Sequence, residues 1–372
     1  MKKILKKIFF ILLPAVLLVS VLAVTLSACI LNNVDVGISM PSRSLPRWQL
    51  DAKYLTEAFE KEGYTSSVLY AGDNVELQLR DIETFISKNV KLIYISPVDA
   101  SKLDQVCQKA HDAGIKIIAH DRMIEDTNFI DYFVTFDSAK VGASCAQFIV
   151  DKLDLDGANK EKTFNIEIVG GDPGDPNAKS VYNGGMDILD RYITTNAQLK
   201  VLSGKIDFED IATAKWNKDI AKTNFKTLYQ DKYLGTPNKL DAVFCSNDST
   251  AQGVAAALTE LDVEIEDFPI ITGQDCDIDS VKNMIAGKQS MSVFKDMRTI
   301  AAEDFKVGLA LLQGETPVTQ TLVNNGTKNV PTVICSITVC TKDGGKIGSV
   351  TTSSIEMALI NSGLYTKSQL GL

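Results

Sequence analysis

The sequence predicts an α/β protein made of two lobes, each built on a doubly wound parallel sheet. Short runs rich in β-branched residues alternate with stretches of helical period. The runs are nearly continuous in apolar residues, as in parallel strands that are covered on both faces. The alternation starts again near the middle of the chain, and 372 residues exceed what a single core usually supports.

The first lobe is predicted from an opening strand at residues 34–38, followed by a helix whose apolar face carries Ala52, Leu55 and Phe59. The same strand-then-helix order continues to residue 118. The further strands are expected at residues 67–70, 92–95 and 115–118. Helix faces between them are marked by Val75, Leu79, Ile82 and Ile86, and then by Leu103, Val106 and Ala110.

The second lobe begins after a strand at residues 132–136 and repeats the pattern. Its helix faces include one with Tyr182, Gly185 and Leu189 and one with Ala251, Val254, Leu258 and Leu261. Strands are expected at residues 164–169, 200–202, 242–244, 269–272 and 290–294.

No long Pro- or Ser-rich linker separates the two lobes, so the chain is expected to cross between them through three short hinge segments. The expected crossings are residues 135–137, residues 294–296 and the turn at 324–326. The first lobe would then comprise 34–136 with 296–324, and the second 137–295 with 325–345. Residues 346–372 would form a C-terminal extension that packs on the lobes.

The N-terminus resembles a bacterial secretory signal for a lipoprotein. Four lysines precede an apolar run from residue 8 to residue 24, and Leu26-Ser27-Ala28 stand directly before Cys29. Cleavage after residue 28 would leave Cys29 as a lipid-bearing N-terminus outside the cytoplasm, at the cell surface or in the periplasm. The alternative is a transmembrane anchor, which Pro14 and the small residues before the cysteine disfavour.

Composition excludes several classes of protein. The net charge of −9 opposes nucleic-acid binding, and loss of the lysine-bearing signal makes the charge more negative. No Gly-rich nucleotide cradle and no G-x-S-x-G serine elbow occur. The acidic run at 275–279 fails as a calcium loop, because Ser280 and Ala286 stand where Gly and Glu are required. We therefore expect no metal and no cofactor.

Six cysteines follow Cys29, and none of their spacings forms a zinc-binding C-x-x-C pair. They are expected to be small buried residues of helices and strands. A bridge between Cys335 and Cys340 is the alternative in an oxidising compartment.

Polar and aromatic side chains follow the predicted strands of both lobes, where the cleft of a two-lobed α/β protein places its ligand. The mixture of charged, amide and indole groups suits a sugar, whose hydroxyls need paired donors and acceptors and whose C–H face stacks on an aromatic ring. These groups are Arg47 and Trp48; His120, Asp121 and Arg122; residues 170–177, which end at Asn177; Lys215, Trp216 and Asn217; Ser246, Asn247 and Asp248; Gln274 and Asp275; and Lys295.

Several of these residues also have structural interpretations. Asp248 is expected to be the N-cap of the helix that follows it. Asp121 and Arg122 could form an interlobe salt bridge, and Trp48 could pack at a helix start. Trp216 is expected to open an amphipathic helix and could belong to the core.

With these motifs in view, the chain resembles the sugar-binding proteins of bacterial ABC importers, of the type I periplasmic binding fold, and within them the xylose-binding and multiple-sugar-binding proteins. The resemblance extends from about Val34 to the C-terminus. It rests on Arg47-Trp48, Asp121-Arg122-Met123-Ile124, residues 170–178, Ser246-Asn247-Asp248, Gly273-Gln274-Asp275 and Asn324-Asn325-Gly326.

The resemblance implies that polar side chains hydrogen-bond the sugar while Trp48 and Trp216 pack on its ring. In two places the chain departs from the pattern. Lys215 stands where the multiple-sugar-binding proteins carry an arginine, and Lys179-Ser180-Val181 replaces their aromatic run after Asn177-Ala178. Ribose and galactose binders carry an arginine at the Val181 position. The implied polar residues are Arg47, Asp121, Arg122, Asn177, Asn247, Asp275 and Lys295.

The sequence thus predicts a lipid-anchored binding protein that performs no chemistry, closes on a monosaccharide and delivers it to an ABC permease. Xylose or glucose is favoured over galactose and ribose. One alternative is a sugar sensor that presents its closed form to a chemoreceptor or histidine kinase. A repressor would carry an N-terminal helix-turn-helix where the signal stands. A secreted glycosidase would need two facing carboxylates, for which Asp121 and Asp275 are the candidates.

Overall fold

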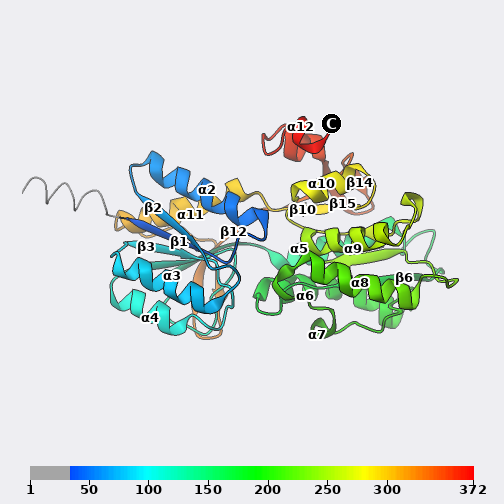
Figure 1. Ribbon diagram of the computed structural model, residues 1–372, viewed down its shortest axis with the longest axis horizontal. Helices are drawn as coiled ribbons and strands as arrows, with labels where there is room; N and C mark the ends of the chain where they lie inside the picture. The colour runs from blue at the N-terminus through cyan, green and yellow to red at the C-terminus, as the bar shows by residue number, and fades with distance from the viewer. Residues whose placement is uncertain (1–33) are drawn as a thin grey trace, which may run out of the picture.

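The computed structural model describes residues 34–372, which form two α/β lobes arranged side by side along the longest axis (Figure 1). The signal segment, residues 1–28, and the lipidation candidate Cys29 lie outside the described residues. Within the described part of the chain, no helix is long and apolar enough to cross a membrane.

The first lobe is built on a seven-stranded sheet in the order β11-β12-β5-β4-β3-β1-β2. The strands from β12 to β2 run parallel, and β11 pairs antiparallel with β12 at the edge. The strands are β1 (Val36–Met40), β2 (Ser66–Tyr70), β3 (Leu92–Ile95), β4 (Lys116–His120), β5 (Tyr132–Phe136), β11 (Thr321–Asn324) and β12 (Asn329–Cys335).

Helices cover both faces of this sheet, so its central strands β1, β3, β4 and β5 are largely buried. α2 (Pro46–Lys61) and α11 (Met297–Leu312) pack together on one face, with Trp48, Leu55 and Phe59 in their core. On the other face, α3 (Val75–Ser87) and α4 (Asp104–Asp112) bury Ile82 and Phe85.

The second lobe contains two four-stranded sheets, β7-β6-β8-β9 and β10-β13-β15-β14. A parallel bridge between Gln274 and Val293 joins them. The strands are β6 (Phe164–Val169), β7 (Leu199–Lys200), β8 (Ala242–Cys245), β9 (Ile270–Ile271), β10 (Ser292–Phe294), β13 (Thr338–Thr341), β14 (Gly345–Ile347) and β15 (Val350–Ser354).

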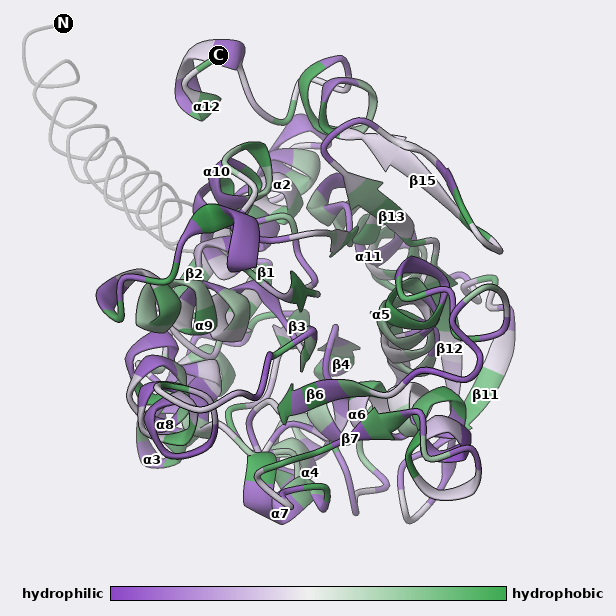
Figure 2. Ribbon diagram, turned by 90° about the vertical axis from the view of Figure 1, so that its right-hand side faces the viewer, coloured by the Kyte–Doolittle hydropathy of each residue, from purple (hydrophilic) through white to green (hydrophobic). Residues whose placement is uncertain are grey.

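The helices of the second lobe also form two layers. α5 and α6 pack closely on one side, and α8 and α9 pack together on the other. Viewed along the long axis, β1, β3 and β4 lie near the centre of the molecule, with helices on either side of them, while β11 and β15 lie at its rim (Figure 2). The helices and short turns are α5 (Ser138–Lys152), α6 (Pro176–Asp190), η1 (Arg191–Thr195), α7 (Phe208–Ile211), η2 (Ala214–Trp216), α8 (Lys218–Lys232), α9 (Asp248–Glu260), η3 (Ile265–Asp267) and α10 (Ile278–Ile285).

Three segments cross between the lobes, and the third differs from its predicted position. The first two leave β5 before α5 and β10 before α11, as expected. The turn at 324–326 is instead a hairpin between β11 and β12, because β12 pairs with β5 inside the first sheet. Residues 329–335 therefore belong to the first lobe, and the third crossing lies between Cys335 and β13.

The C-terminal residues complete the second lobe and also touch the first. β14 and β15 extend the second sheet, and η4 (Glu356–Ile360) and α12 (Lys367–Leu370) pack with α10. Arg298, in the first turn of α11, donates to the carbonyl oxygen of Ser362 at 2.6 Å. The six cysteines after residue 33 are buried and free, so Cys335 and Cys340 are not bridged.

Candidate functional site

The candidate site is a cavity between the lobes, at the carboxyl ends of strands from both sheets. We call it the interlobe cavity. Its free space is only about 20 Å³, room for about one water molecule, because polar side chains from both lobes fill it. It is lined by Leu45, Arg47, Trp48, Asp121, Arg122, Asp175, Asn177, Trp216, Asn247, Gln274, Asp275 and Lys295.

Arg47 joins the two lobes at the centre of this cavity. It lies in the first turn of α2, whose first residue is Pro46. Its guanidinium pairs with Asp121 of the first lobe at 2.8 Å and with Asp275 of the second at 3.1 Å. Burial alone would lower the pKa of Arg47, but the nearby carboxylates raise it above its ordinary value. Arg47 therefore stays charged.

Lys295 provides a second cation from the hinge segment between β10 and α11. Its Nζ lies 3.0 Å from Asp275 and 4.0 Å from Asp121. Burial opposes ionisation of Asp121, but Arg47 and Lys295 together hold its pKa well below the ordinary value. Asp121 is thus an ionised acceptor at all physiological pH values.

The backbone of Asp121 is strained in a way that fixes its side chain. Its φ is 60°, in the left-handed region that residues with a Cβ rarely occupy. Its carbonyl oxygen accepts hydrogen bonds from Thr135 Oγ1 at 2.7 Å and from Asn177 Nδ2 at 2.9 Å. Because the bond from Asn177 comes from the second lobe, contact between the lobes helps to hold this conformation.

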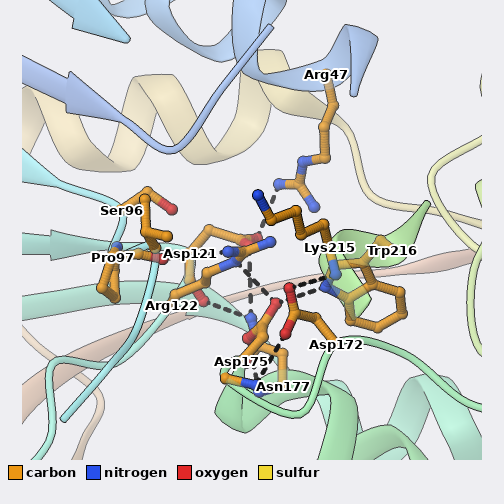
Figure 3. Close-up of polar contacts among 12 residues, drawn as sticks. Arg47, Ser96, Pro97, Asp121, Arg122, Asp172, Asp175, Asn177, Lys215 and Trp216 are labelled. Carbon is orange, nitrogen blue, oxygen red and sulfur yellow. Dashed lines mark hydrogen bonds and ion pairs between the residues drawn. The ribbon is translucent and has the colours of Figure 1, made fainter. Parts of the chain in front are cut away.

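Arg122, Asp175 and Trp216 form a second connection across the cavity (Figure 3). Arg122 of the first lobe pairs with the Asp175 carboxylate at 2.8 Å, and the same carboxylate accepts from Trp216 Nε1 at 3.0 Å. Asp175 is also the N-cap of α6, accepting from the backbone N–H of Asn177. Arg122 thus makes an interlobe salt bridge, as one interpretation of the sequence expected.

Trp216 lies in a strained turn before α8. The prediction that it opens an amphipathic helix is therefore wrong. Lys215 and Trp216 have φ values of 58° and 53°, and α8 begins only at Lys218, after the N-cap Asn217. The backbone N–H of Lys215 donates to Asp172 at 2.7 Å. A Cβ on Gly171 would lie 2.2 Å from the indole, so this position has to be glycine for the ring to fit.

Trp48 is both a core residue and a wall of the cavity. It belongs to the core of the first lobe, yet its ring also faces the cavity. The guanidinium carbons of Arg47 and Arg122 lie 4.7 and 5.0 Å from the centre of the ring. These distances are those of cation–π contacts, so Trp48 supports both arginines.

Asn247 and Gln274 supply amide groups from the second lobe. Asn247, and not Asp248 as predicted, is the N-cap of α9, and its Oδ1 accepts from Thr250. Its Nδ2 has no partner among residues 34–372 and faces the cavity. Gln274 donates to Ser246 at 2.8 Å, while its buried Oε1 accepts nothing from the described chain.

Asp248 has a different, structural role. Its buried carboxylate accepts from Ser292, Gln289 and the backbone N–H of Asp277. These hydrogen bonds connect the start of α9 to β10 and to the start of α10.

His120, the last residue of β4, lies beside two buried carboxylates next to the interlobe cavity. Its Nδ1 lies 2.5 Å from Asp304, and its Nε2 lies 3.7 Å from Asp51, which in turn pairs with Arg47 at 3.4 Å. Burial alone would lower the pKa of His120, but the two carboxylates raise it to about 10. His120 is therefore protonated, bonded to Asp304, and places a positive charge beside Asp51, the partner of Arg47.

The charges that line the cavity balance. Three cations, Arg47, Arg122 and Lys295, face three carboxylates, Asp121, Asp175 and Asp275. No group of side chains between residues 34 and 372 is arranged to hold a metal ion. Such a site favours a neutral ligand with many hydroxyl groups over a phosphate or a carboxylate.

The same contacts contradict the glycosidase alternative. Asp121 and Asp275 share Arg47 and Lys295, and the pKa of Asp121 is lowered. A glycosidase acid needs a carboxyl group that remains protonated near neutral pH.

The structure brings together all predicted binding residues except Lys215, whose side chain lies outside the cavity. Leu45 was not among the residues expected at the cleft, whereas Asp175 and Gln274 were among the polar groups after the strands but were not singled out as binding residues. Asp175 had a usable signal, because an acid directly before Pro176 at a helix start is a typical N-cap.

Comparisons with known proteins match most of the chain. The model of the periplasmic binding protein domain family matches residues 36–316. A multiple sugar-binding periplasmic protein of Azospirillum brasilense is 36% identical over 341 residues, 91% of each chain. The D-xylose-binding periplasmic protein of Escherichia coli is 32% identical and covers 81% of this chain and 84% of its own.

Solved structures of solute-binding proteins are also similar to this chain. An ABC transporter solute-binding protein from Clostridium phytofermentans with bound β-D-glucose has a TM-score of 0.81 and 39% identity, covering 90% of this chain and 99% of its own. A carbohydrate transporter solute-binding protein from Chloroflexus aurantiacus, in complex with D-glucose, has a TM-score of 0.77 and 30% identity. It covers 90% of this chain and 98% of its own.

Proposed function

This chain belongs to the periplasmic binding protein family, and we propose that it is a lipid-anchored solute-binding protein that captures a monosaccharide and delivers it to an ABC permease. It binds its ligand and is not an enzyme. Its relatives are named for sugars, and two similar structures contain glucose.

The observation that carries this proposal is the charge-balanced interlobe cavity with indole walls. Asp121 and Arg122 come from the first lobe, and Asn247 and Asp275 come from the second. Paired acceptors and donors suit vicinal hydroxyls, and Trp48 and Trp216 offer apolar faces to a sugar ring. No single lobe provides the whole set, so binding requires both.

Sugar entry requires the lobes to separate. A pyranose cannot fit into about 20 Å³, so hydroxyls have to replace part of the ion pairing around Arg47 and Lys295. The three crossing segments provide the hinge. The free energy of closure on the ligand then comes from contacts that both lobes make with the sugar.

We favour a D-aldopyranose, with xylose or glucose ahead of galactose and with ribose last. Val181, where ribose and galactose binders carry an arginine, is buried in the core of the second lobe. In calorimetric titrations with these four sugars we expect one-to-one binding that is tightest for xylose or glucose. Tight ribose binding would contradict the ranking, and no response to any of the four would contradict the ligand class.

Lipid anchoring at Cys29 is supported by the sequence Leu26-Ser27-Ala28 before it and by the basic, apolar start of the chain. The described structure begins at residue 34 and β1 at Val36, so the tether would be short. The mature protein would therefore stay close to the bilayer.

A Cys29→Ala variant tests this anchor. We expect the variant to be released from membranes or to remain as uncleaved precursor, because the modified thiol is absent. Membrane fractionation and the mass of the mature N-terminus measure both outcomes. A variant that fractionates and migrates like the wild type would contradict the assignment.

A further inference from the structure

A second and larger space, which we call the outer pocket, opens between the lobes beside the interlobe cavity. Its volume is about 260 Å³, close to the lower end of the roughly 300–1,000 Å³ range of small-molecule sites. Leu45 and Trp216 line both spaces and so form the partition between them. The side chain of Lys215, which is absent from the interlobe cavity, lines the outer pocket instead.

Two buried polar side chains face the outer pocket without a partner. Asp277 and Ser249 are each only 8% exposed, and both line the pocket. No residue between 34 and 372 forms a hydrogen bond or an ion pair with the Asp277 carboxylate or the Ser249 hydroxyl. Their side-chain oxygens open onto the pocket, so a ligand that enters it can hydrogen-bond to both.

The fold itself does not use the Asp277 carboxylate. Asp277 occupies the N-cap position of α10, but its side chain accepts no capping hydrogen bond. Its backbone N–H donates to Asp248 at 2.8 Å. Burial and, to a smaller extent, the neighbouring Asp275 raise the pKa of Asp277 to about 7, against opposing effects of Arg47 and Lys295. Keeping an acid here therefore destabilises the folded protein at neutral pH.

The chemistry of the outer pocket matches a second sugar unit. The Asp277 carboxylate accepts hydrogen bonds, the Ser249 hydroxyl both donates and accepts, and Trp216 provides an apolar wall. The pocket also meets the first turns of α2, α8, α9 and α10. Donors and acceptors together suit hydroxyl groups.

We propose that the outer pocket is a subsite for a second pyranose unit joined to the one in the interlobe cavity, so that the ligands include disaccharides. This inference rests on the proposed function, because the first unit has to occupy the cavity. Both units would enter while the lobes are apart, and Trp216 would then lie between the two subsites.

The test is calorimetric titration of the wild type and Asp277→Asn with D-glucose, cellobiose and maltose. We expect at least one disaccharide to bind the wild type no more than ten-fold more weakly than glucose. Asp277→Asn should weaken that disaccharide about ten-fold or more, the loss of a charged hydrogen bond, and change glucose affinity less than two-fold. Binding of neither disaccharide, or equal effects on disaccharide and glucose, would overturn the proposal.

Two further variants test whether the loss is specific to the second sugar unit. Ser249→Ala should also weaken only the disaccharide, whereas Asp187→Asn should change neither affinity, because Asp187 is an exposed acid of α6 that lines neither space. If the wild type binds no glucose, the proposed function itself fails. Glucose binding without disaccharide binding overturns only the outer subsite.

Thermal unfolding of the Asp277→Asn variant at two pH values checks that the variant is folded and that the carboxylate has no partner. The folded-state pKa of Asp277, about 7, lies above its value of 3.8 in the unfolded chain, so stability falls as the pH rises between these values. Asp277→Asn should therefore raise Tm at pH 8 more than at pH 4.5. A lower Tm at pH 8 would contradict the unpartnered carboxylate on which the subsite depends.

Discussion

Replacement of Arg47 by alanine is expected to abolish sugar binding and to lower the free energy of unfolding by about 3–5 kcal/mol, because removing one partner of a buried ion pair leaves the other uncompensated. Arg47 is the shared partner of Asp51, Asp121 and Asp275, and its side chain is almost completely buried. Denaturant unfolding and calorimetric titration with D-glucose measure the two effects.

A double variant separates stability from binding. Arg47→Met with Asp121→Asn removes both charges of the closest pair and keeps most of the side-chain volume, so much of the stability should return. Sugar affinity should remain at least 100-fold weaker, because the hydroxyls lose a charged donor and a charged acceptor. Recovery of binding in the double variant would show that Arg47 acts only in folding. Lys91→Ala, at an exposed pair with Asp35, should change stability by less than about 1 kcal/mol.

Asp175→Ala is expected to weaken sugar binding by roughly 10- to 150-fold, the range for loss of a charged hydrogen bond. The carboxylate holds Arg122 from the first lobe and the indole N–H of Trp216 from the second. Without it, both side chains lose their orientation at the cavity. Titration calorimetry measures the affinity, and the tryptophan emission spectrum reports the changed surroundings of Trp216.

The matched control is Asp187→Ala, which removes an exposed acid from the same helix, α6. We expect its sugar affinity and emission spectrum to match those of the wild type. Equal losses in the two variants would mean that negative charge on α6, and not the contacts of Asp175, determines binding.

The strands, and with them most of the site, could be predicted from the sequence. A strand covered on both faces is mostly apolar, so β3 and β8 are visible in the sequence as short apolar runs. Parallel strands place their carboxyl ends at one edge of the sheet. The polar residues that follow them, such as Asp121 and Asn247, therefore meet at the interlobe cavity.

The path of the third crossing could not be predicted in the same way. Asn324-Asn325-Gly326 signals a reversal of the chain, and Gly326 has the positive φ that such a turn needs. A turn signal does not say which sheet receives the next strand. Asn325 donates to Ile124 and Thr127 of the first lobe, and these long-range bonds keep the hairpin there.

The strained turn of Trp216 also lies beyond sequence patterns. Two successive residues with positive φ are unfavourable locally, and the helical period that continues into α8 hides them. Tertiary contacts with Asp172, Asp175 and Gly171 stabilise the turn. The helical period alone therefore does not show that Lys215 lines the outer pocket, or that Asp175 bonds to both Arg122 and Trp216.

The measurement that tests the central claim most directly is the crystal structure of the protein grown with D-glucose. We expect one pyranose in the interlobe cavity, with its hydroxyls bonded to Asp121 of the first lobe and to Asn247 or Asp275 of the second. Trp48 or Trp216 should lie against its ring. A sugar bound to one lobe only, or outside this cavity while Arg47 keeps its contacts with Asp121 and Asp275, would contradict the account.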